Sequence, residues 1–220
     1  MRLLVIDCAT EACSVALFDG DPCSGGVLVA GECAILGRGH AERLVPMIAA
    51  LPGNGRADRI AVNAGPGSFT GIRVGLAAAR ALALVWQAPL SGYSCLSLVA
   101  AMARAAQPGT AIPGTAIDVV MTGGHGEWFF QPFAADGTAL ADTLSLTPEQ
   151  ATAVSHAPCL AGSQAEALAA RRGGTPLALP LLPDARAFAL LDADALRADP
   201  LPRYGRAPDA RLPNPLTPAA

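Results

Sequence analysis

A glycine-rich segment constrains the fold of this sequence more than any other part of the chain. It reads Gly65-Pro66-Gly67-Ser68-Phe69-Thr70-Gly71, follows the apolar run Ile60-Ala61-Val62, and opens an alanine-rich stretch that continues to about Trp86. Glycine permits a positive φ or a close backbone approach, and Ser68 and Thr70 are both able to cap a helix that follows. The pattern therefore predicts a strand, a tight loop and a helix.

The loop has two interpretations that its spacing leaves open. Free N–H groups at the positive end of a helix dipole suit an anion, and the alternative is a tight turn that binds nothing. The spacing does not match a Walker loop, because Ile72 follows Gly71 where that motif has lysine. The chain contains no lysine, since all 15 basic residues are arginine, so lysine-based phosphate binding and Schiff-base chemistry are excluded. The candidate anion-binding residues are Gly65, Gly67, Ser68, Thr70 and Gly71.

The remaining patterns predict an α/β chain with two successive units. The first unit has strands near 3–6, 14–18, 27–30 and 60–63, and helices near 40–51, 71–86 and 95–106. The second has strands near 115–118 and 127–130, helices that begin near 148 and 164 at the capping boxes Thr147/Gln150 and Ser163/Glu166, and a last helix over 185–198. We therefore expect subdomains at 1–106 and 107–198 and a proline-rich tail at 199–220 that frays beyond Leu212.

Both units open with an apolar strand that ends in aspartate, which suggests an internal duplication. Leu4-Val5-Ile6-Asp7 is echoed by Thr115-Ala116-Ile117-Asp118. Acidic side chains at strand ends can face each other across a cleft, and duplicated actin-like folds use such a cleft for Mg-ATP. The candidate cleft residues are Asp7, Thr10 and Asp118.

Composition excludes several classes of protein. A net charge of −3 argues against independent nucleic-acid binding, which needs a basic surface. The six cysteines have no C-x-x-C pair and the three histidines have no metal-ligand spacing, so we expect reduced thiols, no metal site and a cytoplasmic location. Asp7 and Glu11 interrupt the apolar N-terminus, which argues against a signal peptide, and Arg73 and Arg80 interrupt the most apolar helix, so we expect no membrane span.

With the loop and both of its flanks in view, the chain resembles the TsaB family. The resemblance rests on three blocks within the first ninety residues: Ile6-Asp7 with Ala9 through Leu17, His40 with Arg43-Leu44 and Pro46-Met47, and Gly65 through Gly75. Shorter matches are Gly92 through Leu96, Ala116-Ile117-Asp118 and Pro202-Arg203-Tyr204-Gly205-Arg206. The segment 119–126 departs from the family pattern, because it lacks the usual Ala-Arg after the second aspartate.

The resemblance implies an actin-like/RNase H-like duplicated α/β fold and a non-catalytic role. Proteins of this family pair with TsaD, which transfers threonylcarbamoyl to adenosine 37 of tRNAs that read codons beginning with A. An ATPase of the TsaE type completes the set, and tRNA is bound through the complex. The resemblance therefore implies a TsaD heterodimer, a homodimer as an alternative state of the isolated chain, no cofactor on this chain, and ATP and metal on partner subunits.

A stripe of small residues gives this role a candidate surface. Gly71, Gly75, Ala79 and Ala83 recur every four residues, and small residues let a second helix approach closely. The alternative is that the stripe packs on the protein's own sheet. With the helix at 40–51 alongside, the expected partner interface consists of His40, Arg43, Leu44, Met47, Gly71, Arg73, Gly75, Leu76, Ala79, Arg80 and Ala83.

Two enzymatic functions are alternatives to this scaffold. An ATP-dependent phosphotransferase would hold magnesium with Asp7 and Asp118, and Glu11 is the nearest candidate acid or base. A peptidase would need a metal or a nucleophile with a neighbouring base, and Gly67-Ser68 lies outside a Gly-x-Ser-x-Gly elbow. His40, at a helix start, is more typical of a cap or a solvated residue, and Tyr204 is expected to anchor the tail through a hydrogen-bonded hydroxyl.

Overall fold

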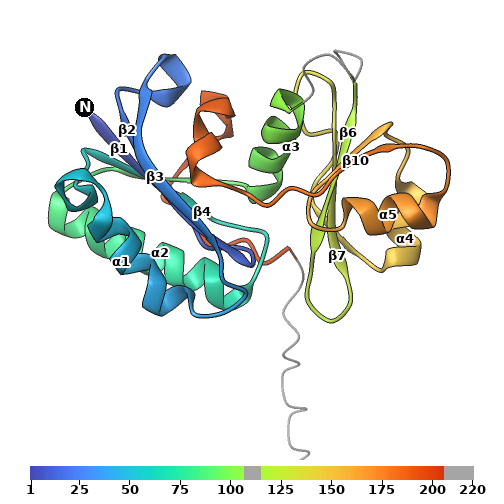
Figure 1. Cartoon of the computed structure of the whole chain (residues 1–220), viewed down its shortest axis with the longest axis horizontal. Helices are drawn as coiled ribbons and strands as arrows, with labels where there is room; N and C mark the ends of the chain where they lie inside the picture. Colours follow the sequence, from blue (N-terminus) through green and yellow to red (C-terminus); the bar gives the residue numbers. More distant parts are fainter. Residues whose placement is uncertain (107–114, 206–220) are drawn as a thin grey trace, which may run out of the picture.

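The computed structural model describes residues 1–106 and 115–205, and two mixed sheets with flanking helices make up this part of the chain (Figure 1). The first series of elements is β1 (Arg2–Asp7), β2 (Ala12–Asp19), β3 (Val27–Ile35), α1 (His40–Ala50), β4 (Arg59–Asn63), α2 (Phe69–Trp86), β5 (Leu90–Tyr93) and α3 (Cys95–Ala105). The second is β6 (Ile117–Thr122), β7 (Trp128–Phe133), β8 (Leu144–Leu146), α4 (Pro148–Val154), β9 (Cys159–Ala161), α5 (Ala165–Arg172), β10 (Leu177–Leu179) and β11 (Arg197–Ala198). The expected fraying beyond Leu212 and the family match at Arg206 lie outside the described residues.

Five strands have the same order in both sheets, and the first sheet has β11 in addition. The first reads β11-β5-β4-β1-β2-β3 and the second reads β10-β9-β6-β7-β8. In each sheet three strands form an antiparallel meander, β1-β2-β3 or β6-β7-β8, and the next two strands add in parallel to the first. The predicted duplication is confirmed, because α1 and α2 hold the same places in the strand order as α4 and α5.

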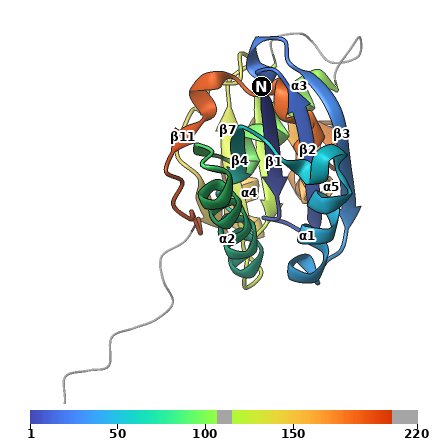
Figure 2. The same ribbon diagram turned by 90° about the vertical axis from the view of Figure 1, so that its left-hand side faces the viewer.

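The central strand β1 is apolar on both faces because both faces are covered. Leu4 and Ile6 pack with residues of α1 and α2, whereas Leu3 and Val5 pack with residues of α3 and of the 3-10 turn η3 (Ala185–Leu190). A strand that is buried on two sides reads as a continuous apolar run rather than an alternating one. Figure 2 shows α1 and α2 together on one face of this sheet.

The helix α3 joins the two halves. Leu96 and Val99 pack with the second sheet, whereas Leu98 and Ala101 pack with the first. The opposite face of the second sheet is covered by α4 and α5. The helix thus lies between the sheets, as Figure 1 shows, and both cores depend on it.

The described C-terminal segment returns to the first sheet. The helix expected over 185–198 is wrong: η3 and η4 (Ala193–Ala195) are followed by β11, which pairs with β5. Phe188 is buried between Phe18 and Tyr93 of the first sheet. This placement also differs from the expected subdomain at 107–198, because long-range burial of an aromatic side chain outweighs sequence proximity to the second half.

The two predicted capping boxes have different outcomes. Thr147 and Gln150 form one at the start of α4, with both reciprocal hydrogen bonds. The box expected at Ser163 is wrong, because the Ser163 hydroxyl accepts the backbone N–H of Thr122 at 2.9 Å. A hydroxyl that bonds a neighbouring strand is no longer available to the helix start.

α2 corrects the expectation about membrane-spanning length. Among the described residues, it is the one helix long and apolar enough to cross a membrane by length and composition, in spite of Arg73 and Arg80. One side of it is buried on the first sheet, at Gly71, Ile72, Gly75, Leu76 and Ala79. Val74, Ala78, Leu82, Ala83 and Trp86 are partly buried against the same core, and the exposed apolar residues are Phe69, Ala77, Ala81, Leu84 and Val85.

Candidate functional site

The glycine loop packs tightly against two other backbone segments. A side chain at Gly67 would overlap the carbonyl oxygen of Ala9, and one at Gly71 would overlap that of Cys8. At Gly65, where φ is +108°, a side chain would overlap the carbonyl oxygen of Arg203. These glycines are therefore required by the approach of the β1–β2 turn and of the C-terminal segment.

Several N–H groups of the loop are already bonded within the protein. The Gly65 N–H donates to Asn63 Oδ1 at 2.8 Å and the Ser68 N–H donates to the Ala9 carbonyl at 2.7 Å. Ser68, rather than Thr70, caps α2, because its hydroxyl accepts the N–H of Gly71 at 3.2 Å. The interpretation as a tight structural turn accounts for all of these contacts, and the anion-binding interpretation stays a hypothesis.

Asp7 lies at the end of β1 and is completely buried. Asn63 Nδ2 and the Tyr93 hydroxyl donate to Asp7 Oδ2 at 2.7 and 3.0 Å, and the Ala9 N–H donates to Oδ1 at 3.2 Å. Burial raises the pKa of Asp7 to about 7, although these three hydrogen bonds oppose the shift. Asp7 thus connects the ends of β1, β4 and β5 beneath the loop.

Asp118 does not face Asp7, and the predicted carboxylate pair is wrong. Asp118 is the second residue of β6, and its Oδ2 accepts hydrogen bonds from the Ser155 hydroxyl and from the N–H groups of His156 and Ala157 at 2.8–3.0 Å. The residue at the hairpin end of β6 that corresponds to Asp7 is Thr122. The similarity between the two sequence segments was therefore out of register by four residues.

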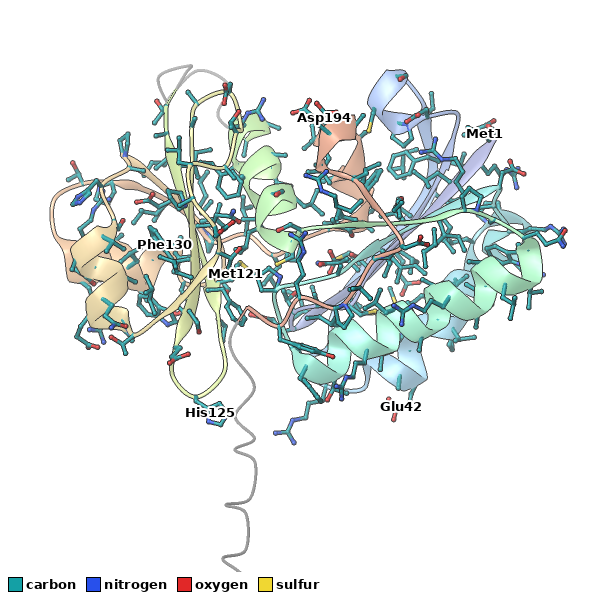
Figure 3. The ribbon with its side chains drawn as sticks, turned by 180° about the vertical axis from the view of Figure 1, so that it is seen from behind. Met1, Glu42, Met121, His125, Phe130 and Asp194 are labelled. Carbon is teal, nitrogen blue, oxygen red and sulfur yellow. The ribbon has the colours of Figure 1, made fainter. Side chains whose placement is uncertain are left out.

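A cavity of about 1010 Å³ lies between the two halves, where the β1–β2 and β6–β7 turns meet the glycine loop. Figure 3 shows His125 at the tip of the β6–β7 hairpin. Of the three predicted cleft residues, Thr10 lines this cavity, and its hydroxyl accepts the Ala12 N–H at 3.2 Å. The other lining residues are Ala9, Glu11, Gly37, Gly67, Ser68, Phe69, Arg73, Thr122, Gly123, Gly124, His125, Phe129, Pro202 and Tyr204.

An aromatic and arginine cluster closes one side of the cavity. The Tyr204 hydroxyl accepts a hydrogen bond from Arg73 Nε at 2.9 Å, and its ring lies 4.9 Å from the ring of Phe69. The Arg73 guanidinium lies 3.5 Å from the Phe69 ring centroid, within the range of a cation–π contact. The expected anchoring role of Tyr204 is confirmed, and its partners, Phe69 and Arg73, come from the first two turns of α2.

Most of the residues expected at a partner interface face the protein's own core. His40, Leu44, Met47, Gly71, Gly75, Leu76 and Ala79 are buried, whereas Arg43, Arg73 and Arg80 are exposed and Ala83 is half-buried. The predicted orientation of the stripe is therefore wrong: Gly75 and Ala79 pack on the first sheet, against residues such as Cys8 and Val62. His40 Nε2 is a buried atom without a hydrogen-bond partner among the described residues.

The outward faces of the two helices carry residues that sequence reasoning missed. On α1 they are Val45, Pro46 and Ala49, and on α2 they are Ala77, Ala81, Leu84 and Val85. Ala77, Ala81 and Leu84 have the same i, i+4, i+7 spacing as the buried Ile72, Leu76 and Ala79 but lie on another side of the helix. The signal was thus present in the sequence, and only the position of the sheet decides which stripe faces outward.

The exposed arginines make local bonds. Arg43 forms an ion pair with Glu32 at 2.7 Å, and Arg80 donates to the Pro200 carbonyl at 2.8 Å. These contacts connect α1 to β3 and α2 to the C-terminal segment.

Within residues 1–106 and 115–205 there is no group of three or more His, Cys, Asp or Glu that could hold a metal ion.

Comparisons with known proteins agree with this architecture. A family model described as TsaD, tRNA N6-adenosine threonylcarbamoyltransferase, matches residues 33–190. The TsaB protein of Escherichia coli (strain K12) is 38% identical over 105 residues, which cover 46% of this chain and 43% of that protein. The TsaB protein of Bacillus subtilis (strain 168) is 30% identical over 109 residues, which cover 47% and 45%. The chain thus spans less than half of the length of these curated relatives.

Solved structures extend the similarity to most of the chain. YeaZ from Pseudomonas aeruginosa is 26% identical and superimposes with a TM-score of 0.71 over 92% of this chain and 99% of that chain. The predicted actin-like/RNase H-like α/β fold is confirmed. By the match of its family model and by these relatives, the chain belongs to the TsaD family and, within it, to the TsaB/YeaZ proteins.

Proposed function

We propose that this chain acts in the formation of threonylcarbamoyladenosine in tRNA as a non-catalytic subunit. It pairs with a TsaD protein through the outward faces of α1 and α2. The names of its relatives, TsaB proteins of threonylcarbamoyladenosine biosynthesis, support the pathway.

The observation that supports a docking surface on α1 and α2 is the exposure of apolar side chains on both helices. Val45 is 61% exposed on α1, and Leu84 and Val85 are 81% and 76% exposed on α2. Contiguous exposed apolar patches on a folded protein mark interaction sites. Ala77 and Ala81 leave the α2 backbone open to close approach by another helix, because side-chain size sets the distance between helix axes.

A partner with the same fold fits this surface. It would present a matching pair of helices, so that four helices would bury one apolar seam. A second copy of this chain has the same helices, and homodimerisation of the isolated protein is therefore the competing state. We expect a TsaE-type ATPase and tRNA to join through the complex, because a net charge of −3 argues against independent nucleic-acid binding by this chain.

The two aspartates support a non-catalytic role. Magnesium-dependent phosphoryl transfer needs carboxylates that converge on one site. Asp7 is buried under the glycine loop, whereas Asp118 is bonded to residues 155–157 near the start of β6, away from the β6–β7 hairpin. We therefore expect ATP and metal to be bound by partner subunits.

Co-expression with the host's TsaD protein tests the proposal. The two proteins should co-purify, and threonylcarbamoyladenosine in tRNA, measured by nucleoside mass spectrometry, should depend on this chain. Leu84→Asp should leave the fold intact and weaken co-purification at least about tenfold, since a charge would be buried without a partner. The matched control is Leu140→Asp, which changes a 62%-exposed leucine in the second half.

Three outcomes would contradict the proposal. They are tRNA modification that does not need the chain, a Leu84→Asp protein that binds TsaD normally, and ATP turnover by the purified chain that disappears in Asp7→Asn. If Leu140→Asp loses binding as well, the effect is not specific to α1 and α2, and the assignment of the interface to these two helices is contradicted.

A further inference from the structure

Two cysteines face each other below the glycine loop. Cys8 directly follows β1 and Cys13 lies in β2, one position beyond the last strand pair, Asp7 with Ser14. Their sulfur atoms are 3.6 Å apart, both side chains are buried, and both are free thiols. The hairpin therefore holds two thiols at van der Waals contact.

The geometry is close to that of a disulfide. A disulfide needs an S–S distance of about 2.05 Å and a Cβ–Cβ distance of about 3.5–4.5 Å. Residues directly opposite each other on antiparallel strands have Cβ atoms about 4.5–5.5 Å apart. The distance between the two sulfurs must therefore shorten by about 1.5 Å, from 3.6 Å to about 2.05 Å, for the bond to form.

The two thiols differ in acidity. A hydrogen bond from Cys8 lowers the pKa of the Cys13 thiol, and the same contact, together with burial, raises the pKa of Cys8. The thiolate is the reactive form of cysteine. The thiolate that the contact between the two sulfurs stabilises is therefore the nucleophile of the pair.

We propose that Cys8 and Cys13 are a redox-active dithiol that a hydroperoxide converts into an intramolecular disulfide. The Cys13 thiolate attacks one peroxide oxygen, and the O–O bond breaks to give Cys13 sulfenic acid and one water. Cys8 then attacks the sulfenic sulfur, and the S–O bond breaks to release a second water as the S–S bond forms. Two thiols are oxidised while one hydrogen peroxide is reduced to two waters.

The new bond would act on two functional parts of the chain. Residues 9–11, between the cysteines, line the cavity. The Cys8 carbonyl lies against Gly71, and its side chain lies near Gly75, so movement of Cys8 is transmitted to the first two turns of α2. Because both sulfurs are buried, the reaction waits for local opening of the hairpin, and we expect it to take minutes to hours.

The test uses the full chain, reduced and then exposed to hydrogen peroxide under native conditions. Before alkylation, we expect an intact mass lower by two hydrogens. After alkylation in denaturant, we expect four alkylated cysteines instead of six, and dithiothreitol should reverse both changes. Proteolytic cleavage after Glu11 separates Cys8 from Cys13, so these two fragments should stay linked until reduction. Cys13→Ser should abolish the bridge, and Cys33→Ser, a matched control outside the pair, should retain it.

Several results would overturn the proposal. These are six alkylated cysteines after peroxide treatment, a bridge between any other pair, a bridge that forms only in denaturant, or sulfinic acid at Cys13 with Cys8 still free. The fragment map of the unmodified sequence decides the matter even where a serine variant does not fold.

Discussion

The two halves of the chain share one topology but differ in their helices and in their surfaces. The first half carries α2, with 18 residues, where the second carries α5, with 8. The outward face of α2 carries Ala77, Ala81, Leu84 and Val85 beside Arg73 and Arg80. By contrast, α5 ends in Arg171 and Arg172, and Arg171 pairs with Glu149 of α4. The duplicated fold has therefore kept one strand order, while the helices that cover the corresponding faces of the two sheets differ in length and in surface composition.

The turns that face the cavity differ in the same way. In the first half, β1 ends in the buried carboxyl group of Asp7 below a loop whose glycines touch other backbones. In the second, β6 ends in Thr122, which is bonded to Ser163 and Gln164 at the surface. The first half thus has the more densely packed and the more easily disrupted turn.

Adding a tryptophan to one helix of each half should give the largest contrast. Ala79 of α2 is 0% exposed, so Ala79→Trp should destabilise the protein by more than about 3 kcal/mol and abolish soluble expression. Ala170→Trp, at an exposed position of α5, should change stability by less than about 0.5 kcal/mol. Thermal unfolding and soluble yield are the measurements, and a well-folded Ala79→Trp would place α2 differently from the arrangement described here.

Removing the aspartate of the second half should have the next largest effect. Asp118→Ala leaves the N–H groups of His156 and Ala157 and the Ser155 hydroxyl without their acceptor, at a cost of about 2–3 kcal/mol in the free energy of unfolding. Denaturant titration measures this. A loss of less than about 0.5 kcal/mol would mean that water replaces the carboxylate and that Asp118 does not anchor the 155–157 turn.

Asp7, the aspartate of the first half, should make the free energy of unfolding depend on pH. Because burial raises the pKa of Asp7 to about 7, the folded state binds this proton more tightly than the unfolded chain, whose value is near 3.8. The stabilising effect of the proton is complete below about pH 4 and is lost as the pH rises to about 7. Relative to Asp7→Asn, the wild-type protein should lose about 1 kcal/mol of stability per pH unit across this window. Parallel stability curves for the two proteins would show that Asp7 is charged in the fold at acidic pH.

The smallest expected effect concerns the cluster that joins the C-terminal segment to α2. Tyr204→Phe keeps the ring contact with Phe69 but removes the hydrogen bond from Arg73, so the free energy of unfolding should fall by about 0.5–1 kcal/mol. Tyr204→Ala should cost more, because the ring contact is lost as well. Equal stability of the two variants, measured by denaturant titration, would show that the ring contributes nothing.

The local features of the fold could be predicted from the sequence because neighbouring residues decide them. The glycine loop, the strand before it, the helix after it and the cap at Thr147 follow from backbone sterics and from capping chemistry within a few residues. The helix expected at 185–198 could not be predicted correctly, because Phe188 is held by Phe18 and Tyr93, which lie far away in the sequence.

The features of the candidate site likewise separate into those that local sequence predicts and those that depend on distant residues. The sequence by itself determined that β4 leads through a glycine turn into a long helix with small residues on one stripe, because φ preferences and helical periodicity are properties of short segments. Only the tertiary structure decided which side of α2 faces the sheet, that Thr122 rather than Asp118 corresponds to Asp7, and that Cys8 and Cys13 meet. Those choices depend on strand register and on burial against distant residues, which local spacing does not encode.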